Sequence, residues 1–250
     1  MDRKKPEIIT IASIKGGVGK STSALFFSNI LSSEEQRVLL IDSDPQASVT
    51  SYFLLQLQGQ NVDIEKYNLY EILKQKKYIE NCIFSMSEFI DIIPSSLELS
   101  SFNSESIPLQ DNLLEKRLLS IKLKYDYIII DTNPSLGHLL NNALIIADYL
   151  VIPINSDLWA VESIDLITDA IKKVYREDLV PNFLVTGALE RQSIDKEIIS
   201  ELEIRYREKL IGIIPKRDDI KKTIFYRKDF CLDNDYYQAY KKALNNLLKK

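Results

Sequence analysis

Residues 15–22 read Lys-Gly-Gly-Val-Gly-Lys-Ser-Thr, and this stretch decides the fold. The apolar residues 8–12 come directly before it and predict a buried strand, and the helix-compatible residues 23–31 follow it. A glycine loop between a strand and a helix is the context in which such a motif binds phosphate. Glycine has no Cβ, so the backbone can approach an anion closely. The N–H groups of the loop and of the helix N-terminus then point at the phosphates.

We therefore predict a nucleotide-binding loop. Lys20 is expected to reach the β and γ phosphates, and the Ser21 hydroxyl is expected to ligate Mg²⁺. The alternative is a chance glycine-lysine loop, and the agreement of the motif with both of its flanks argues against it. The predicted nucleotide-binding residues of this loop are Gly16, Gly17, Val18, Gly19, Lys20, Ser21 and Thr22.

Two further predicted strands end in acidic residues. Residues 37–42 end in Asp42, Asp44 follows two residues later, and residues 126–131 end in Asp131. Ligands of parallel sheets bind beyond the carboxyl ends of the strands, so these carboxylates are placed for magnesium and water. For Asp42 and Asp44 the alternative is turn formation, since Asp and Pro punctuate strands. For Asp131 it is helix capping, which the gap to the next predicted helix disfavours.

Strand-like and helix-like runs alternate along the chain, which predicts an α/β fold with a doubly wound, mostly parallel sheet flanked by helices. Strands that are apolar nearly throughout, such as residues 127–130, fit burial on both faces. With no linker or repeat in the sequence, we expect a single domain over residues 1–250. The predicted strands are 7–13, 37–42, 89–93, 126–131, 149–154, 183–188 and 209–214. The predicted helices are 20–33, 46–56, 68–75, 111–122, 138–147, 159–176, 193–208 and 234–249.

Composition excludes several classes of protein. No apolar stretch approaches the roughly 20 residues of a membrane span, and neither the two cysteines nor the one histidine offers metal-ligand spacing. We expect a cytoplasmic protein. The net charge is −4, but residues 172–250 carry 18 Lys and Arg against 13 Asp and Glu. This basic third is either a nucleic-acid surface or a set of solvated helix faces.

The motifs together resemble the ParA/MinD family of P-loop ATPases. Residues 15–22 resemble its deviant Walker A motif, in which Lys15 follows a residue that is not the usual glycine, here Ile14. Residues 42–46 resemble the Walker A′ motif of ParA proteins, and residues 125–134 resemble Walker B. Asn133 departs from that family's pattern, because a proline usually stands there, and we expect a looser loop after the strand.

The resemblance implies roles for these residues. The catalytic residues would be Lys15, Lys20 and Asp44, with Lys15 reaching across a dimer into the partner's nucleotide and Asp44 positioning the attacking water. Ser21, Asp42 and Asp131 would form the metal site, with Asp42 orienting waters around the Mg²⁺. Pro215 would lie near the base. Arg191 matches a DNA-contacting arginine, and Lys221 and Lys222 are candidates to replace a second one.

The implied function is an ATP-dependent partition ATPase of a plasmid or chromosome, of the small type without an N-terminal helix-turn-helix. Its ATP-bound homodimer would bind non-specific DNA on the nucleoid, and a ParB-type partner would stimulate hydrolysis. A MinD-like, membrane-cycling division regulator is the alternative. The C-terminal run 234–249 has three interpretations: a core helix, a membrane-targeting helix or a tyrosine-kinase tail. The absence of a guanine-recognition motif favours ATP over GTP.

Overall fold

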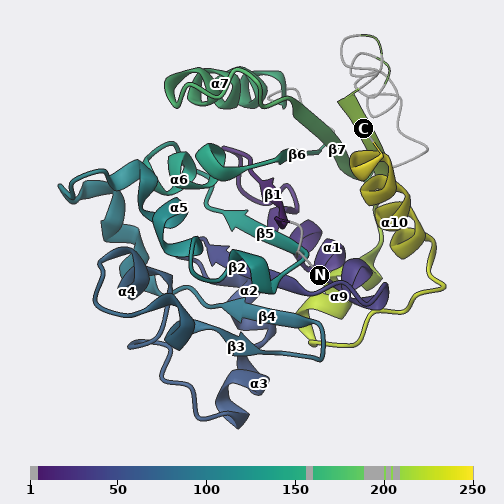
Figure 1. Ribbon diagram of the computed structural model, residues 1–250. Helices are drawn as coiled ribbons and strands as arrows, with labels where there is room; N and C mark the ends of the chain where they lie inside the picture. Colours follow the sequence, from purple (N-terminus) through teal and green to yellow (C-terminus); the bar gives the residue numbers. More distant parts are fainter. Residues whose placement is uncertain (1–4, 156–159, 189–199, 201–203, 205–208, 250) are drawn as a thin grey trace.

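The computed structural model describes residues 5–155, 160–188, 200, 204 and 209–249. Their central feature is an eight-stranded sheet in the order β3-β4-β2-β5-β1-β6-β7-β8 (Figure 1). Every neighbouring pair is parallel except β3 and β4 at one edge. The strands are β1 (Glu7–Ile11), β2 (Val38–Ser43), β3 (Phe84–Ser85), β4 (Ile90–Ile93), β5 (Tyr127–Thr132), β6 (Tyr149–Asn155), β7 (Pro181–Ala188) and β8 (Leu210–Pro215).

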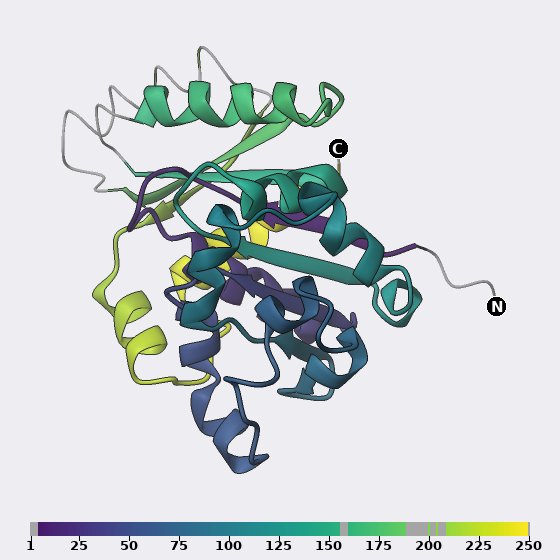
Figure 2. The same ribbon diagram turned by 90° about the vertical axis from the view of Figure 1, so that its left-hand side faces the viewer.

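Helices cover both faces of this sheet (Figure 1), as a doubly wound fold requires. On one face lie α1, α2, α3 and α10; on the other lie α4, α5, α6 and α7. In Figure 2, α7 runs along the top of the view and α9 projects at the lower left. The helices are α1 (Lys20–Ser33), α2 (Ser48–Tyr52), α3 (Leu54–Gly59), α4 (Leu69–Leu73), α5 (Leu113–Leu118), α6 (His138–Ile146), α7 (Ala160–Lys173), α9 (Asp218–Phe225) and α10 (Asp235–Leu248).

The strands bury alternate residues on opposite faces. Leu40 and Ile129 pack under α1, whereas Leu39 and Ile130 pack against the helices of the other face. Side chains of a strand alternate in this way, and here both sets are apolar because both faces are covered. The doubly wound α/β fold predicted from the sequence is therefore confirmed.

Helix α10 belongs to the core. Tyr236, Tyr237 and Tyr240 are each no more than 4% exposed, and the Tyr240 ring stacks on Phe26 of α1 with centroids 4.2 Å apart. A Cβ on Gly212 would lie 2.7 Å from the Cβ of Ala243, so β8 and α10 approach closely only because residue 212 is glycine. Of the three interpretations of the C-terminal run, the core helix is confirmed.

Several sequence boundaries need correction. The predicted helix 46–56 is two short helices, α2 and α3, because Ala47 has a left-handed backbone (φ 53°) and Phe53 leaves the helical region. Residues 111–122 are helical as α5 only over Leu113–Leu118, with single 3-10 turns on either side. Helix α9 and the short edge strand β3 were not predicted. The predicted helix 193–208 lies outside the described residues, apart from positions 200 and 204.

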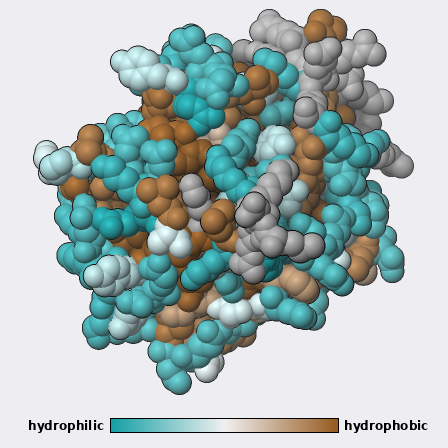
Figure 3. Space-filling view, viewed as in Figure 1, coloured by the Kyte–Doolittle hydropathy of each residue, from teal (hydrophilic) through white to brown (hydrophobic). Residues whose placement is uncertain are grey.

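The surface mixes polar and apolar groups. On the face seen in Figure 3, hydrophilic residues dominate the rim and hydrophobic residues appear between them toward the middle. Among the helices that the structure describes, none is both long enough and apolar enough to cross a bilayer.

Candidate nucleotide site

The phosphate loop predicted at residues 15–22 connects the carboxyl end of β1 to α1. Gly17 and Gly19 have φ angles of 74° and 88°, a region in which residues with a Cβ are strained. Gly19 immediately precedes the first residue of α1, Lys20. The glycines therefore allow the loop to turn sharply into the helix, so that the helix N-terminus opens toward an anion.

Residue Thr186 of β7 holds this loop from the side. Its hydroxyl donates to the carbonyl oxygen of Val18 at 2.8 Å. A Cβ on Gly19 would lie 3.6 Å from Thr186 Cγ2, so the strand and the loop are in close contact. This role of Thr186 is not among the predictions, although a hydroxyl residue at the end of the apolar run 183–185 is a visible signal.

Lys20 is the buried cation of the site. It is 6% exposed, and its Nζ donates to the carbonyl oxygen of Lys15 at 3.2 Å. Burial lowers the pKa of the Lys20 ammonium, and the negative charges of Asp131 and Asp44 oppose that shift. The loop lysine and the acids at the ends of β2 and β5 therefore come together, as the sequence predicts.

Asp42 is the second-last residue of β2 and is completely buried. Its Oδ2 accepts hydrogen bonds from the backbone N–H and the hydroxyl of Thr50, at 2.8 and 2.7 Å. Burial raises the pKa of Asp42 to about 6, and the bonds from Thr50 act in the opposite direction. Asp44 lies two residues after Asp42, and its Oδ1 accepts a hydrogen bond from the N–H of Gln46 at 2.9 Å. Thr50 was not identified from the sequence.

Asp131 lies opposite Asp42 across the β2–β5 pair and is also fully buried. No donor in the described part of the chain makes a well-formed hydrogen bond to either of its carboxylate oxygens. Burial and the charge of Asp42 raise the pKa of Asp131 well above its usual value, while the nearby Ser21 hydroxyl and Lys20 lower it.

Buried polar groups without partners are rare in native structures, and a buried carboxylate of this kind suits a bound cation. Carboxylate and hydroxyl oxygens are the ligands that Mg²⁺ prefers. Asp131 and Ser21, with Asp42 behind them, therefore fit the predicted magnesium site.

A cavity of about 390 Å³ opens beside the loop. Residues 17–19 and Thr22 form one wall, and residues 214–217 form another, so Pro215 lines the cavity, and its position near the base stays a prediction. Lys221 of α9 also lines this cavity. Lys221, a candidate DNA contact, thus lies at the rim of the cavity beside the phosphate loop.

The remaining predicted residues are spread around this centre. Lys15 is half-buried on the loop, and its N–H donates to the Ser13 hydroxyl at 3.3 Å. Lys222 is exposed on α9 and forms an ion pair with Asp219 at 3.2 Å. Arg191 lies outside the described residues.

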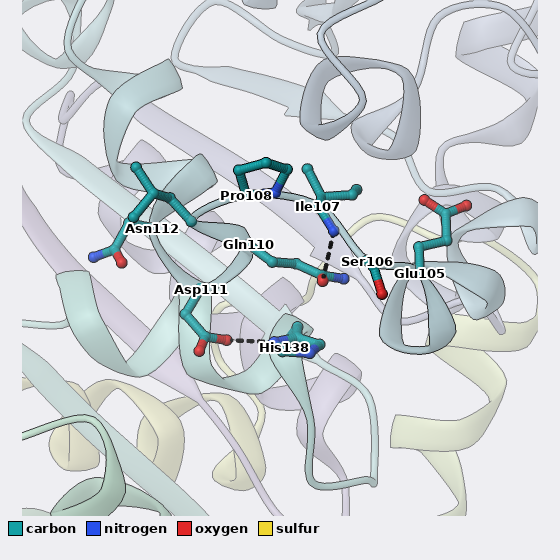
Figure 4. A pocket seen from close by; sticks show the side chains of 9 residues that line it. Glu105, Ser106, Ile107, Pro108, Gln110, Asp111, Asn112 and His138 are labelled. Carbon is teal, nitrogen blue, oxygen red and sulfur yellow. Dashed lines mark hydrogen bonds and ion pairs between the residues drawn. The ribbon is translucent and has the colours of Figure 1, made fainter.

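A second hollow, of about 650 Å³, is lined by residues 105–112 and His138 (Figure 4). In it the Nδ1 of His138 lies 2.7 Å from Oδ1 of Asp111, which also accepts from the Asn141 amide at 3.1 Å. No phosphate-loop residue lines this open groove, so it is separate from the nucleotide site.

Comparison with known families agrees with this geometry. Residues 6–185 match the AAA domain family. The chain is 32% identical over 218 residues to the sporulation initiation inhibitor protein Soj of Bacillus subtilis, covering 84% of each chain. It is 31% identical over 224 residues to the chromosome partitioning protein ParA of Myxococcus xanthus, covering 84% of this chain and 75% of that protein.

Among solved structures, a putative plasmid partition protein from Borrelia burgdorferi B31, bound to AMPPNP, superposes with a TM-score of 0.92. It is 41% identical, and the match covers 98% of this chain and 99% of that one. The family match over most of the chain and these relatives agree with the site assembled from the phosphate loop and three strand-end acids. The chain belongs to the ParA family of partition ATPases.

Proposed function

We propose that residues 1–250 form a single Mg²⁺-dependent ATPase domain that partitions a plasmid or chromosome. The observation that carries this proposal is the fully buried Asp131, which has no well-formed hydrogen bond in the described part of the chain and lies beside Lys20 under the phosphate loop. The Borrelia partition protein, which is bound to an ATP analogue, supports the choice of nucleotide.

The chain's residues supply positioning and charge, on which phosphoryl transfer mainly depends. The backbone N–H groups of residues 16–19 and the Lys20 ammonium bind the phosphates, and Asp44 accepts a hydrogen bond from the attacking water. Ser21 and Asp131 would hold Mg²⁺, with Asp42 orienting its waters, and the bound metal would neutralise charge on the phosphate oxygens.

The nucleotide state would control assembly. Lys15 of one subunit reaches the triphosphate of a second copy, so that ATP joins two chains and hydrolysis loosens them. DNA affinity then follows the dimer, because two basic surfaces act together. Arg191, Lys221 and Lys222 are the proposed DNA contacts. A ParB-type partner stimulates hydrolysis, and the ATP-bound form is associated with the nucleoid in the cytoplasm.

The membrane-cycling alternative has no feature of its own in the described residues. The apolar stripe of α10, on which that alternative depends, packs on α1 and β8. Partition therefore remains the one function that we propose.

The test is the anisotropy of a fluorescent non-specific DNA duplex, titrated with the protein in Mg-ATP, in Mg-ADP and without nucleotide. We expect binding with ATP alone, and persistent binding for Asp44→Ala because that variant does not hydrolyse the nucleotide. Lys222→Ala should weaken binding. Lys172→Ala is its matched control, because Lys172 is equally exposed and also pairs with an acid three residues before it. DNA binding that is absent or indifferent to nucleotide, or ATP-dependent binding to anionic vesicles instead, would contradict the proposal.

A further inference from the structure

At the ends of β2 and β5, two pairs of residues carry side-chain oxygens near the proposed metal site. The strands pair with Asp42 opposite Asp131 and with Ser43 opposite Thr132. Asp44 and Asn133 come one residue after Ser43 and Thr132, and each is 7% exposed. The first pair, Asp42 and Asp131, belongs to the proposed magnesium site, and the second pair is Asp44 and Asn133.

Asn133 lies two residues after Asp131 in the sequence. Ile129, two residues before Asp131, packs in the cluster under α1, and alternate residues of a strand share a face. Thr132 is used differently, because its hydroxyl donates to the carbonyl oxygen of Ile11 at 3.0 Å. β5 ends at Thr132, so Asn133 is the first residue beyond the strand, next to the end of the β2–β5 pair that carries Asp42 and Asp131.

The Asn133 side chain is anchored at one end and unsatisfied at the other. Its Nδ2 donates to the Ser135 hydroxyl at 2.7 Å, which fixes the orientation of the amide and ties the loop that the sequence analysis expected to be loose. Its Oδ1 is buried and accepts no hydrogen bond from the described residues. Leaving such an oxygen unpaired is unfavourable, because it has lost its hydrogen bonds to water and gained none in return. Such a buried acceptor is normally paired with a ligand or an ordered water.

We propose that the Asn133 side-chain oxygen is the second acceptor for the attacking water, alongside Asp44. This inference rests on the proposed ATPase function. A water oxygen attacks phosphorus through a lone pair, so both of its O–H bonds must point away from the nucleotide. Asp44 accepts one of these O–H groups and Asn133 accepts the other, and the water is fixed in line with the bond to be broken.

The step balances in atoms and charge. The water oxygen bonds to the γ-phosphorus, and the bond from phosphorus to the β,γ-bridging oxygen breaks to give ADP and phosphate. Asp44 takes one water proton and passes it to solvent, and the other proton stays on the phosphate oxygen beside Asn133. Asn133 is thus a positioning residue, and the proline usual at this place in ParA relatives could not serve in this way.

The test compares wild type with Asn133→Leu, which has a similar volume and no acceptor. The loss of one hydrogen bond to the water should lower kcat for ATP about 5- to 100-fold. The KM for ATP and the affinity for AMPPNP should stay within about 3-fold, because the water is not part of the bound nucleotide. The affinity for ADP with aluminium fluoride, which mimics the transition state, should fall by the same factor as kcat.

Two further variants sharpen the result. Ser135→Ala removes the anchor and keeps the oxygen, so its loss of kcat should be smaller. Asn133→Ala repeats the experiment with less steric change. If wild type hydrolyses ATP and both Asn133 variants keep its kcat and its affinity for ADP with aluminium fluoride, this inference is wrong and the proposed function stands. Wild type that hydrolyses no ATP overturns the proposed function, and this inference with it.

Discussion

Mild acid should stabilise the nucleotide-free protein. Burial raises the pKa of Asp42 to about 6, against 3.8 in an unfolded chain. Burial and the charge of Asp42 also raise the pKa of Asp131. Between the unfolded and folded pKa values of Asp42, the folded state binds more protons than the unfolded state. The free energy of unfolding therefore rises as the pH falls through this range. The stabilisation is complete below the unfolded pKa and is lost as the pH rises through the folded one.

The magnitude follows from Asp42 alone. A shift of about two pH units corresponds to about 3 kcal/mol. About 1 kcal/mol of it appears between pH 7 and pH 5, which raises Tm by about 2–4 °C for a chain of this size. Asp131 adds to this in the same direction. Acids at or near the surface with lowered pKa values lose their contribution only at lower pH; they are Asp63, Glu80, Glu105, Asp178 and Asp235.

The assay is urea unfolding followed by circular dichroism at pH 7, 6 and 5, with EDTA and without nucleotide. Asp42→Asn is the control, because it lacks the titrating group but experiences the same change in net charge at all other sites. We expect the gain of wild type to shrink in this variant. A wild-type stability that is flat or falls from pH 7 to pH 5, or an equal gain in Asp42→Asn, would refute the reasoning.

Two substitutions test the packing around the site. Gly212→Ala should lower the free energy of unfolding by about 1–3 kcal/mol, because the new Cβ meets that of Ala243 at 2.7 Å. Gly59→Ala, where nothing lies within 4 Å, should change it by less than about 0.5 kcal/mol, and an equal loss in both variants by urea unfolding would contradict this account. Thr186→Val removes the bond to the Val18 carbonyl and should weaken AMPPNP binding about 3- to 10-fold by calorimetry. Unchanged affinity would show that the bond does not hold the loop.

The sequence predicted the sheet well because its strands are bounded apolar runs. All seven predicted strands are present, with ends that shift by about two residues at most. Helix α1 begins and ends as predicted, since Gly19 marks its start clearly. The run 46–56 is not one helix because helix propensity reports neither the left-handed backbone of Ala47 before α2 nor the break at Phe53 between α2 and α3.

Helix α9 could have been found. Asp218 and Asp219 lie in its first turn and Lys222 in its last, which is the charge order that a helix dipole favours. The only prediction for this stretch is a set of possible DNA contacts. The charges that suggested a binding surface also mark the two ends of a helix.

The residues of the candidate site could be predicted where they lie close together in the sequence. The phosphate loop and the strand-end acids each lie within a short motif, and parallel strands bring their ends together. Thr186 reaches Val18 across 168 residues, and Thr50 reaches Asp42 only after the chain has turned back through α2. Such contacts depend on tertiary packing and leave no spacing signal in the sequence.

The central claim is that ATP joins two copies of the chain through Lys15. Light scattering on a size-exclusion column measures this directly, with Asp44→Ala used to preserve the nucleotide. For Asp44→Ala we predict the mass of two chains in Mg-ATP and the mass of one chain in Mg-ADP. For the double variant that also carries Lys15→Gln, we predict the mass of one chain with either nucleotide. A single-chain mass for Asp44→Ala in saturating Mg-ATP, or an undiminished dimer in the double variant, would contradict it.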